Sequence, residues 1–217
     1  MANPTPHSGG LELASLRAAL APYGVVIDAR RIGPGDDAAF VDSGDVATMV
    51  NLSRRRASGA ARIVARRLLG ELGSDAAATL RRSPSGAPLW PEGIAGSLAH
   101  DDEWAVAAAA RRARLAEHSV KGLGVDIEPA ETLPADLVAY VLSDEERRRT
   151  GTDGVIGRLV FACKEAVYKA IHPLDGSPLD YSDIEIRLDD STATLCDGRS
   201  LRLFTGGGPR LVAVALT

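Results

Sequence analysis

The two halves of the chain have a similar pattern of predicted helices and strands, and this similarity is the strongest constraint on the fold. Residues 52–73 (LSRRRASGAARIVARRLLGELG) have helical spacing with a basic face, and residues 157–171 (GRLVFACKEAVYKAI) have helical spacing with an apolar stripe. Each half also contains a strand-like run of small apolar residues, WAVAAAA at 104–110 and RLVAVALT at 210–217. The shared pattern predicts two similar α+β lobes, residues 1–115 and 116–217, joined through residues 111–122.

Composition excludes several classes of protein. The 217 residues are 45% hydrophobic and 25% charged, which is typical of a globular protein. Aromatic residues make up only 4%, so the core is expected to consist mainly of Ala, Val and Leu. A net charge of −4 argues against a nucleic-acid partner, and no apolar run approaches the roughly 18 residues that span a bilayer.

Compartment and local structure are predicted from simple signals. The two cysteines lack metal-binding spacing and no secretory leader is visible, so a reducing cytoplasm is expected. Ser143 with Glu146 three residues later predicts a capped helix start, and Pro173 is expected to end the helix that begins near residue 157. Further strands are expected at 25–30, at 119–129 and in three segments from residue 182 onward. A helix is expected at 11–24 and a Pro- and Gly-rich loop at 83–96.

The motif GVDIEP at residues 124–129 carries two acids in a strand-like context. Side chains alternate along a strand, so Asp126 and Glu128 share one face while Val125 and Ile127 share the other. Two carboxylates side by side repel each other unless a cation lies between them, and Mg²⁺ prefers such oxygen ligands. The alternative is an exposed edge strand with solvated acids, and the motif alone does not decide between the two.

The motif FACKEAVYKA at residues 161–170 is unusual in its choice of cation. The chain contains only three lysines against 22 arginines, and two of them, Lys164 and Lys169, flank Glu165. In a helix, Glu165 and Lys169 lie on one face, while Lys164 lies about 100° away from Glu165. An ordinary solvated Glu–Lys pair explains the pattern in isolation, and a lysine beside a reacting phosphate is the alternative.

A third group of residues is suited to an anion. Arg54 and Arg62 lie eight residues apart, about two helical turns, so they share a face of the basic helix. His100 follows a Gly-rich segment at the predicted end of a strand. Guanidinium groups bind phosphate well, so this region is a candidate phosphate site. A solvated helix face and a structural histidine are the alternative reading.

Together these blocks resemble the 4′-phosphopantetheinyl transferase superfamily, in the subgroup typified by the enterobactin synthetase component D. The matching segments are GAARIVARRLLGELG, GAPLWPEGIAGSLAH, GVDIEP and FACKEAVYKAIHPLDGSPLDYSDIEI, which fall within residues 54–186. The spacing of about 35 residues between GVDIEP and the KEAxYK block is the specific part of the resemblance. It implies two α/β lobes related by pseudo-twofold symmetry, with coenzyme A in the cleft between them.

The resemblance also implies roles for individual residues. Asp126, Glu128 and Glu165 match metal-binding carboxylates, for Mg²⁺ with Mn²⁺ as an alternative. The residues implied to bind coenzyme A are Arg54, Arg62, His100, Lys164 and Lys169. Glu165 is the candidate general base, Lys169 is expected to neutralise phosphate charge, and Lys164 is expected to hold the pyrophosphate.

The implied reaction moves the phosphopantetheine arm of coenzyme A onto a serine of an acyl, peptidyl or aryl carrier protein and releases adenosine 3′,5′-bisphosphate. The enzyme is expected to be a monomer. Departures from the family pattern, Ser85, Ala99 and the pair Ala57–Ser58, all lie on the side expected to bind coenzyme A. They keep two alternatives open: a non-catalytic module that binds coenzyme A or a carrier protein, and a metal-dependent phosphohydrolase.

Overall fold

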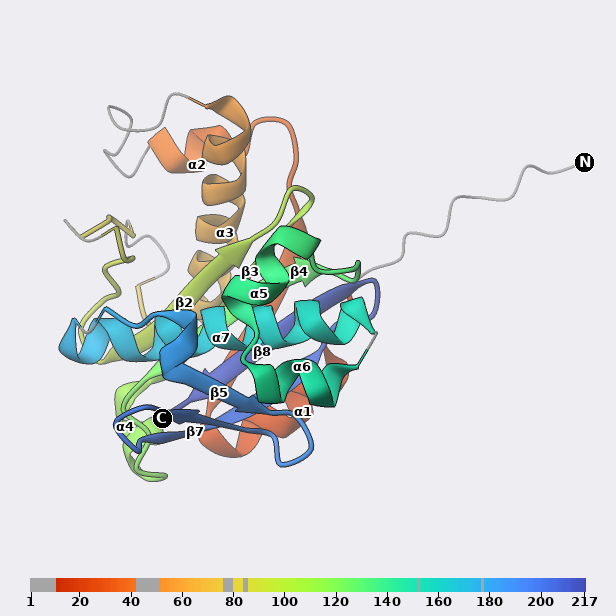
Figure 1. Ribbon diagram of the computed structural model, residues 1–217. Coiled ribbons are helices and arrows are strands. Elements are labelled where there is room, and N and C mark those ends of the chain that lie inside the picture. The colour runs from red at the N-terminus through yellow and green to blue at the C-terminus, as the bar shows by residue number, and fades with distance from the viewer. Residues whose placement is uncertain (1–10, 42–50, 76–79, 84–85, 152, 177) are drawn as a thin grey trace, which may run out of the picture.

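The chain forms two antiparallel sheets, each covered by a long helix (Figure 1). The computed structural model describes residues 11–41, 51–75, 80–83, 86–151, 153–176 and 178–217. The first half contains α1 (Ala14–Leu20), η1 (Ala21–Tyr23), β1 (Val25–Arg31), α2 (Asp37–Val41), α3 (Leu52–Glu71), β2 (Ile94–His100), β3 (Trp104–Arg111) and α4 (Arg112–Ala116). The second contains β4 (Leu123–Pro129), α5 (Ala135–Val141), α6 (Asp144–Thr150), α7 (Gly154–Asp175), η3 (Tyr181–Asp183), β5 (Ile184–Arg187), β6 (Thr192–Leu195), β7 (Ser200–Gly206) and β8 (Arg210–Leu216).

Strand order follows the predicted division into halves. The first sheet has the order β1-β3-β2 and the second has the order β4-β8-β7-β6-β5. All the strand pairs are antiparallel. The α+β class and the two-lobed arrangement predicted from the sequence are therefore confirmed, although the sheets differ in size, with three and five strands.

The layers are helix, sheet, sheet, helix, and side-chain alternation explains them. On β3, Val106 and Ala108 face the core between the two sheets, whereas Ala107 and Ala109 face α3. On β8, Val212, Val214 and Leu216 likewise face the core between the sheets, and the alternate alanines face α7. The small side chains on the helix-facing side allow each helix to pack closely on its sheet, and the core is built mainly of Ala, Val and Leu, as expected.

The two sheets meet along β2 and β4. The hydroxyl of Ser97 on β2 accepts a hydrogen bond of 3.0 Å from the backbone N–H of Val125 on β4, and both groups are buried. The core between the sheets draws on both halves of the chain, and Leu16 of α1 also reaches Gly206 of β7. The division at residues 115 and 116 therefore stays a prediction, because one continuous core joins the two lobes.

The local predictions are confirmed in part. The loop predicted for residues 83–96 is too long at its end, because β2 already begins at Ile94. Ser143 and Glu146 form the expected capping box at the start of α6. Pro173 does not end α7, which continues to Asp175 and stops at Gly176 in the left-handed conformation (φ 69°). A proline inside a helix removes one N–H donor. Pro173 lies so close to the end of α7 that few helical hydrogen bonds remain to be lost. Among the described helices, none is long and apolar enough to cross a membrane.

Candidate active site

Strand β4 and helix α7 lie in direct contact because Gly124 has no side chain. A Cβ on Gly124 would lie 1.9 Å from the carbonyl oxygen of Ala166 and 2.6 Å from the backbone nitrogen of Ala170. The glycine of GVDIEP therefore sets the distance between strand and helix. Asp126 and Glu128 share its face of β4 and are carried toward the side chains of α7.

Asp126 and Lys169 form the centre of the site. Lys169 Nζ donates a hydrogen bond of 2.6 Å to Asp126 Oδ1, and the aspartate is buried. Burial raises the pKa of Asp126 against the opposing effect of Lys169, and the nearby charge of Glu165 raises it further. The second oxygen, Oδ2, is buried and has no hydrogen-bond partner among the described residues.

Glu128 is held by an arginine that the sequence reasoning did not single out. Arg158 of α7 donates a 2.9 Å hydrogen bond to Glu128 Oε2 and a 3.2 Å hydrogen bond to the carbonyl of Thr132. Burial, followed by the charge of Asp126, raises the pKa of Glu128 to about 7 despite this arginine. Arg158 precedes Glu165 by seven residues, or two helical turns, and that spacing could have placed it on the same helix face.

Glu165 is bound by a tyrosine from another segment. The hydroxyl of Tyr181, in η3, donates a hydrogen bond of 2.5 Å to Glu165 Oε1. Burial, followed by this hydrogen bond, raises the pKa of the Tyr181 hydroxyl, so it stays protonated and acts as a donor. Because Tyr181 lies outside the KEAxYK block, no local sequence signal connected it to Glu165.

The three predicted metal ligands are carboxylates, and their oxygen atoms are chemically suited to a divalent cation. In the described part of the chain, no three His, Cys, Asp or Glu side chains form a ready metal cluster, because Asp126, Glu128 and Glu165 each bind a separate donor. However, Oδ2 of Asp126 is buried without a partner, and burial raises the pKa of both Asp126 and Glu128, with a smaller contribution from neighbouring carboxylates. Such a set of oxygen donors suits Mg²⁺ or Mn²⁺, and the predicted metal triad stays a prediction.

Lys164 lies elsewhere than the sequence suggested. Its side chain is fully buried, and its Nζ contacts Glu146 Oε2 at 2.7 Å together with two backbone carbonyls. The structure therefore does not bring Lys164 to the group formed by Asp126, Glu165 and Lys169. The reason is helical geometry. Lys164 directly precedes Glu165, so its side chain points about 100° away from that of Glu165, here into the protein.

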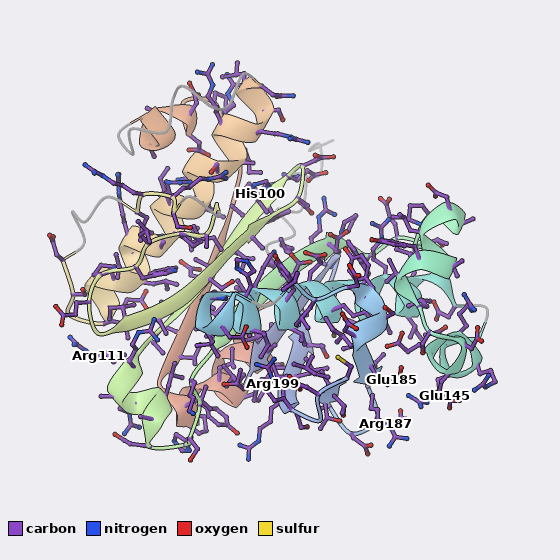
Figure 2. All side chains as sticks on the ribbon, turned by 60° about the vertical axis from the view of Figure 1, so that its left-hand side comes forward. His100, Arg111, Glu145, Glu185, Arg187 and Arg199 are labelled. Carbon is purple, nitrogen blue, oxygen red and sulfur yellow. The ribbon has the colours of Figure 1, made fainter. Side chains whose placement is uncertain are left out.

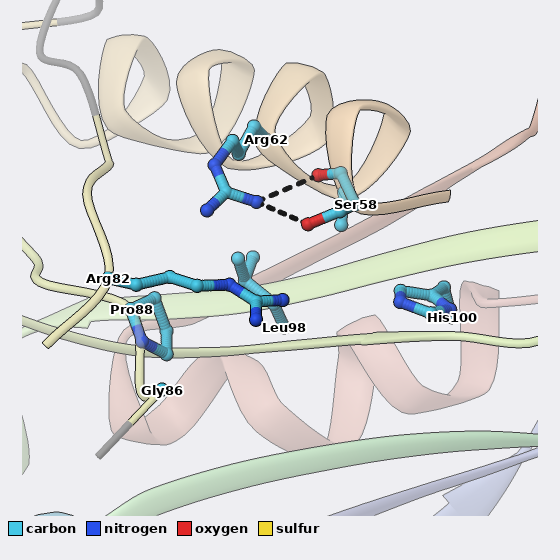
Figure 3. A pocket seen from close by; sticks show the side chains of 8 residues that line it. Ser58, Arg62, Arg82, Gly86, Pro88, Leu98 and His100 are labelled. Carbon is cyan, nitrogen blue, oxygen red and sulfur yellow. Dashed lines mark hydrogen bonds between the residues drawn. The ribbon is translucent and has the colours of Figure 1, made fainter. Parts of the chain in front are cut away.

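A small pocket lies on the side of the predicted phosphate ligands. It has a volume of about 110 Å³ and is lined by Ser58, Ala61, Arg62, Arg82, Gly86, Pro88, Leu98 and His100 (Figure 3). Arg62 is buried, and it donates to the Ser58 hydroxyl at 2.5 Å and to the Leu80 carbonyl at 3.0 Å. Much of its guanidinium thus fixes the pocket wall, whereas Arg82 is exposed and extends across the pocket in Figure 3.

His100 connects this pocket with the carboxylates. It ends β2, at the opposite end of the β2–β3 hairpin from Arg111 (Figure 2). Although the residue is exposed, the surrounding protein removes enough water to lower its pKa, and the charges of Lys169 and Arg82 lower it further. The lysine that binds Asp126 thus also influences the charge state of His100.

Among the remaining predicted features that the structure describes, Ser58 alone lines the pocket. Arg54 is exposed in the first turn of α3 and is not among the pocket-lining residues. Ala99 is buried in the core between the sheets, and Ser58 binds Arg62. Ser85 lies outside the described residues.

A larger cleft of about 950 Å³ opens beside Lys169. Its walls come from both lobes: Ala95, Ser97 and Leu98 of β2 on one side, and Gly122 with Lys169 on the other. Trp90 packs over Gly96, where a Cβ would lie 2.5 Å from the indole ring. A cleft between two lobes that is lined by the cations Arg112, Lys121 and Lys169 is suited to an extended substrate that carries phosphate groups.

Comparison with known proteins identifies the family. Residues 42–110 match the 4′-phosphopantetheinyl transferase N-terminal domain, and residues 122–208 match the 4′-phosphopantetheinyl transferase superfamily. The chain therefore belongs to the 4′-phosphopantetheinyl transferase superfamily. The two matched ranges fall on the two lobes and include every predicted site residue.

Curated relatives carry the same designation. The chain is 36% identical over 150 residues to 4′-phosphopantetheinyl transferase Npt of Nocardia iowensis, which covers 67% of this chain and 65% of the relative. It is 38% identical over 141 residues to 4′-phosphopantetheinyl transferase Svp of Streptomyces mobaraensis, with 61% and 54% covered. It is 35% identical over 133 residues to 4′-phosphopantetheinyl transferase PptT of Mycobacterium tuberculosis, with 59% and 56% covered. The similarity thus spans a little over half to about two thirds of these relatives.

Proposed function

We propose that the protein transfers the 4′-phosphopantetheine arm of coenzyme A to a serine of an apo carrier protein. One observation supports this proposal above the others: Lys169 hydrogen-bonds to the buried Asp126 and also lines the cleft between the lobes, which adjoins the pocket of Arg62 and His100. A single ammonium group therefore contacts a candidate metal-binding carboxylate and faces the cleft next to the phosphate-type pocket. A pyrophosphate bound across Lys169 would have one end at each.

The proposed roles follow from where the residues lie. Arg62, Arg82 and His100 would receive the phosphate groups at the adenosine end of coenzyme A, and Lys169 the pyrophosphate. Asp126, Glu128 and Glu165 would hold Mg²⁺, or Mn²⁺ in its place. When bound, this ion would neutralise pyrophosphate charge and polarise the phosphorus centre.

The chain's own residues account for the remaining chemistry. The serine oxygen of the carrier forms a bond to phosphorus, and the bond from phosphorus to the adenosine 3′,5′-bisphosphate oxygen breaks. Glu165 accepts the serine proton, directly or through water, because it keeps one oxygen free of Tyr181. Lys169 balances the charge that develops on the leaving phosphate.

Further proposals concern setting and partners. We propose membership of the enterobactin synthetase component D-like subgroup, with carrier domains of fatty-acid, polyketide or peptide synthases as substrates. Because both walls of the cleft come from one chain, a monomer is sufficient. The two free cysteines, one buried and one exposed, are compatible with the reducing cytoplasm that we propose as the compartment.

The test is a mass measurement on the carrier. The protein is incubated with coenzyme A, Mg²⁺ and several apo carriers, and each carrier is weighed. A gain equal to one phosphopantetheine group is expected, and it should disappear in Asp126→Ala and Glu165→Ala while the circular dichroism spectrum is unchanged. Coenzyme A binding without any gain would indicate a binding module. Release of phosphopantetheine without a carrier would indicate a phosphohydrolase.

A further inference from the structure

A fully buried ion pair lies directly behind the proposed catalytic carboxylate. Lys164 exposes 0% and Glu146 1% of their side chains, and Lys164 Nζ lies 2.7 Å from Glu146 Oε2. An ammonium group has three hydrogens. Here they face three oxygens, those of Glu146, of the Val141 carbonyl at 2.8 Å and of the Tyr181 carbonyl at 2.9 Å. Lys164 is saturated by protein and has no donor left for a substrate.

The partners of Lys164 come from three separate segments. Val141 ends α5, Glu146 belongs to α6, and Tyr181 begins η3, so one side chain of α7 fastens all three to the helix. Glu146 is fixed in turn, because it accepts hydrogen bonds of 2.8 Å from the backbone N–H groups of Ser143 and Ile186. Both carboxylate oxygens are thus used, and the pair forms a closed buried network.

Tyr181 links this network to the active site. Its backbone carbonyl binds Lys164, and its hydroxyl donates to Glu165 Oε1. Its ring is packed by Phe161 and Tyr140, with ring centroids 5.8 Å and 5.3 Å away. Because both the backbone and the ring of Tyr181 are held, the position of its hydroxyl is set by the buried pair and its neighbours.

We propose that Tyr181 is a positioning residue for the Glu165 carboxylate, and that the Glu146–Lys164 pair holds Tyr181 in place. This inference rests on the proposed function, in which Glu165 binds the metal ion and accepts the serine proton. Tyr181 binds one carboxylate oxygen, Oε1, and leaves Oε2 available for the metal ion or the serine proton. Such outer partners of metal ligands typically change metal affinity or activity by about 10–100-fold when removed.

The first experiment removes a single hydroxyl. Tyr181→Phe keeps the ring contacts and loses only the hydrogen bond to Glu165. Tyr140→Phe is the matched control, since its ring lies against Tyr181, whereas the hydrogen bond to Glu165 comes from the Tyr181 hydroxyl. Mn²⁺ binding in the presence of coenzyme A is followed by electron paramagnetic resonance. We expect affinity about tenfold weaker for Tyr181→Phe and wild-type affinity for Tyr140→Phe.

The second experiment reads the contacts themselves, without metal or substrate. Tyrosine labelled with ¹³C at Cζ reports the hydrogen bond of each phenol by nuclear magnetic resonance. Glu165→Gln should shift the Tyr181 signal and leave that of the distant Tyr23 in place. Glu146→Gln, which keeps the shape of the pair but weakens its charge, should also shift or broaden the Tyr181 signal.

Two results would overturn the inference. One is a Tyr181→Phe protein that binds Mn²⁺ and modifies the carrier as well as the wild type does. The other is a Tyr181 resonance whose chemical shift and line width are the same in Glu165→Gln, Glu146→Gln and the wild type. A wild-type protein that neither binds Mn²⁺ nor transfers would refute the proposed function instead, and the labelled signal would still decide whether Tyr181 is held as proposed.

Discussion

The substitution Lys164→Met tests the buried ion pair most directly. Methionine is close to lysine in length and apolar shape, so the change removes the charge and three donors without opening a large cavity. What remains is the Glu146 carboxylate, 1% exposed, with two backbone N–H donors but no cation. The carbonyls of Val141 and Tyr181 lose their donor at the same time.

The size of the effect follows from this loss. Removing one partner of a buried pair typically costs about 3–5 kcal/mol, because an uncompensated charge stays in the interior. The two N–H groups that still donate to Glu146 reduce the expected cost toward the lower end of this range. The two carbonyls left without a donor raise it toward the upper end. For a chain of this size, the same loss corresponds to a decrease in melting temperature of roughly 6–20 °C.

Urea unfolding, followed by tryptophan fluorescence and circular dichroism, measures the difference in unfolding free energy. Arg148→Met is the matched control, since Arg148 pairs with Glu145 at the surface of α6, and its midpoint should stay close to wild type. Adding Glu146→Gln to Lys164→Met should restore part of the loss, because the buried charge is then removed. A loss below about 1 kcal/mol for Lys164→Met, as for a surface pair, would refute this reasoning.

Three further outcomes are expected. The pKa of Glu128 in the folded protein is about 7, above its ordinary value of 4.5. The metal-free protein should therefore lose stability as the pH rises from 4.5 through 7. Urea midpoints measured across that range should fall less steeply in Glu128→Gln than in the wild type. Gly124→Ala forces a Cβ to within 1.9 Å of the Ala166 carbonyl, so the urea midpoint and the transfer rate should both drop, whereas Gly157→Ala, with its nearest contact at 3.4 Å, should fold normally. Arg82→Ala should raise the KM for coenzyme A roughly tenfold with an unchanged midpoint, and an unchanged KM would exclude it from the phosphate site.

Much of the site could be predicted from local pattern. Alternation along GVDIEP placed Asp126 and Glu128 on one strand face, and the structure confirms that both face α7. The i,i+4 spacing placed Lys169 on the face of Glu165, and Lys169 does reach Asp126. These predictions succeed because strand and helix periods fix side-chain directions whatever the rest of the chain does.

Other residues were beyond local reasoning. Arg62 has the same helical face as Arg54, yet burial turns it into a support for Ser58 and Leu80 while Arg54 stays exposed. Arg82 follows a different segment and enters the same pocket. The segment that follows Leu80 packs against α3 and decides which arginine can face a ligand. The helical period of the sequence does not predict this packing.

The sequence by itself determined the two-lobed α+β fold, the order of the motifs and the carboxylates of the candidate site. Only the tertiary structure decided what the two lysines of FACKEAVYKA do. Lys169 meets Asp126 at the cleft, whereas Lys164 is enclosed by Glu146 and the ends of α5 and η3. The physical reason is that a charge takes its role from the partners that desolvate or solvate it. Those partners lie 23 and 18 residues before Lys164 and 17 after it, so packing alone brings them to it.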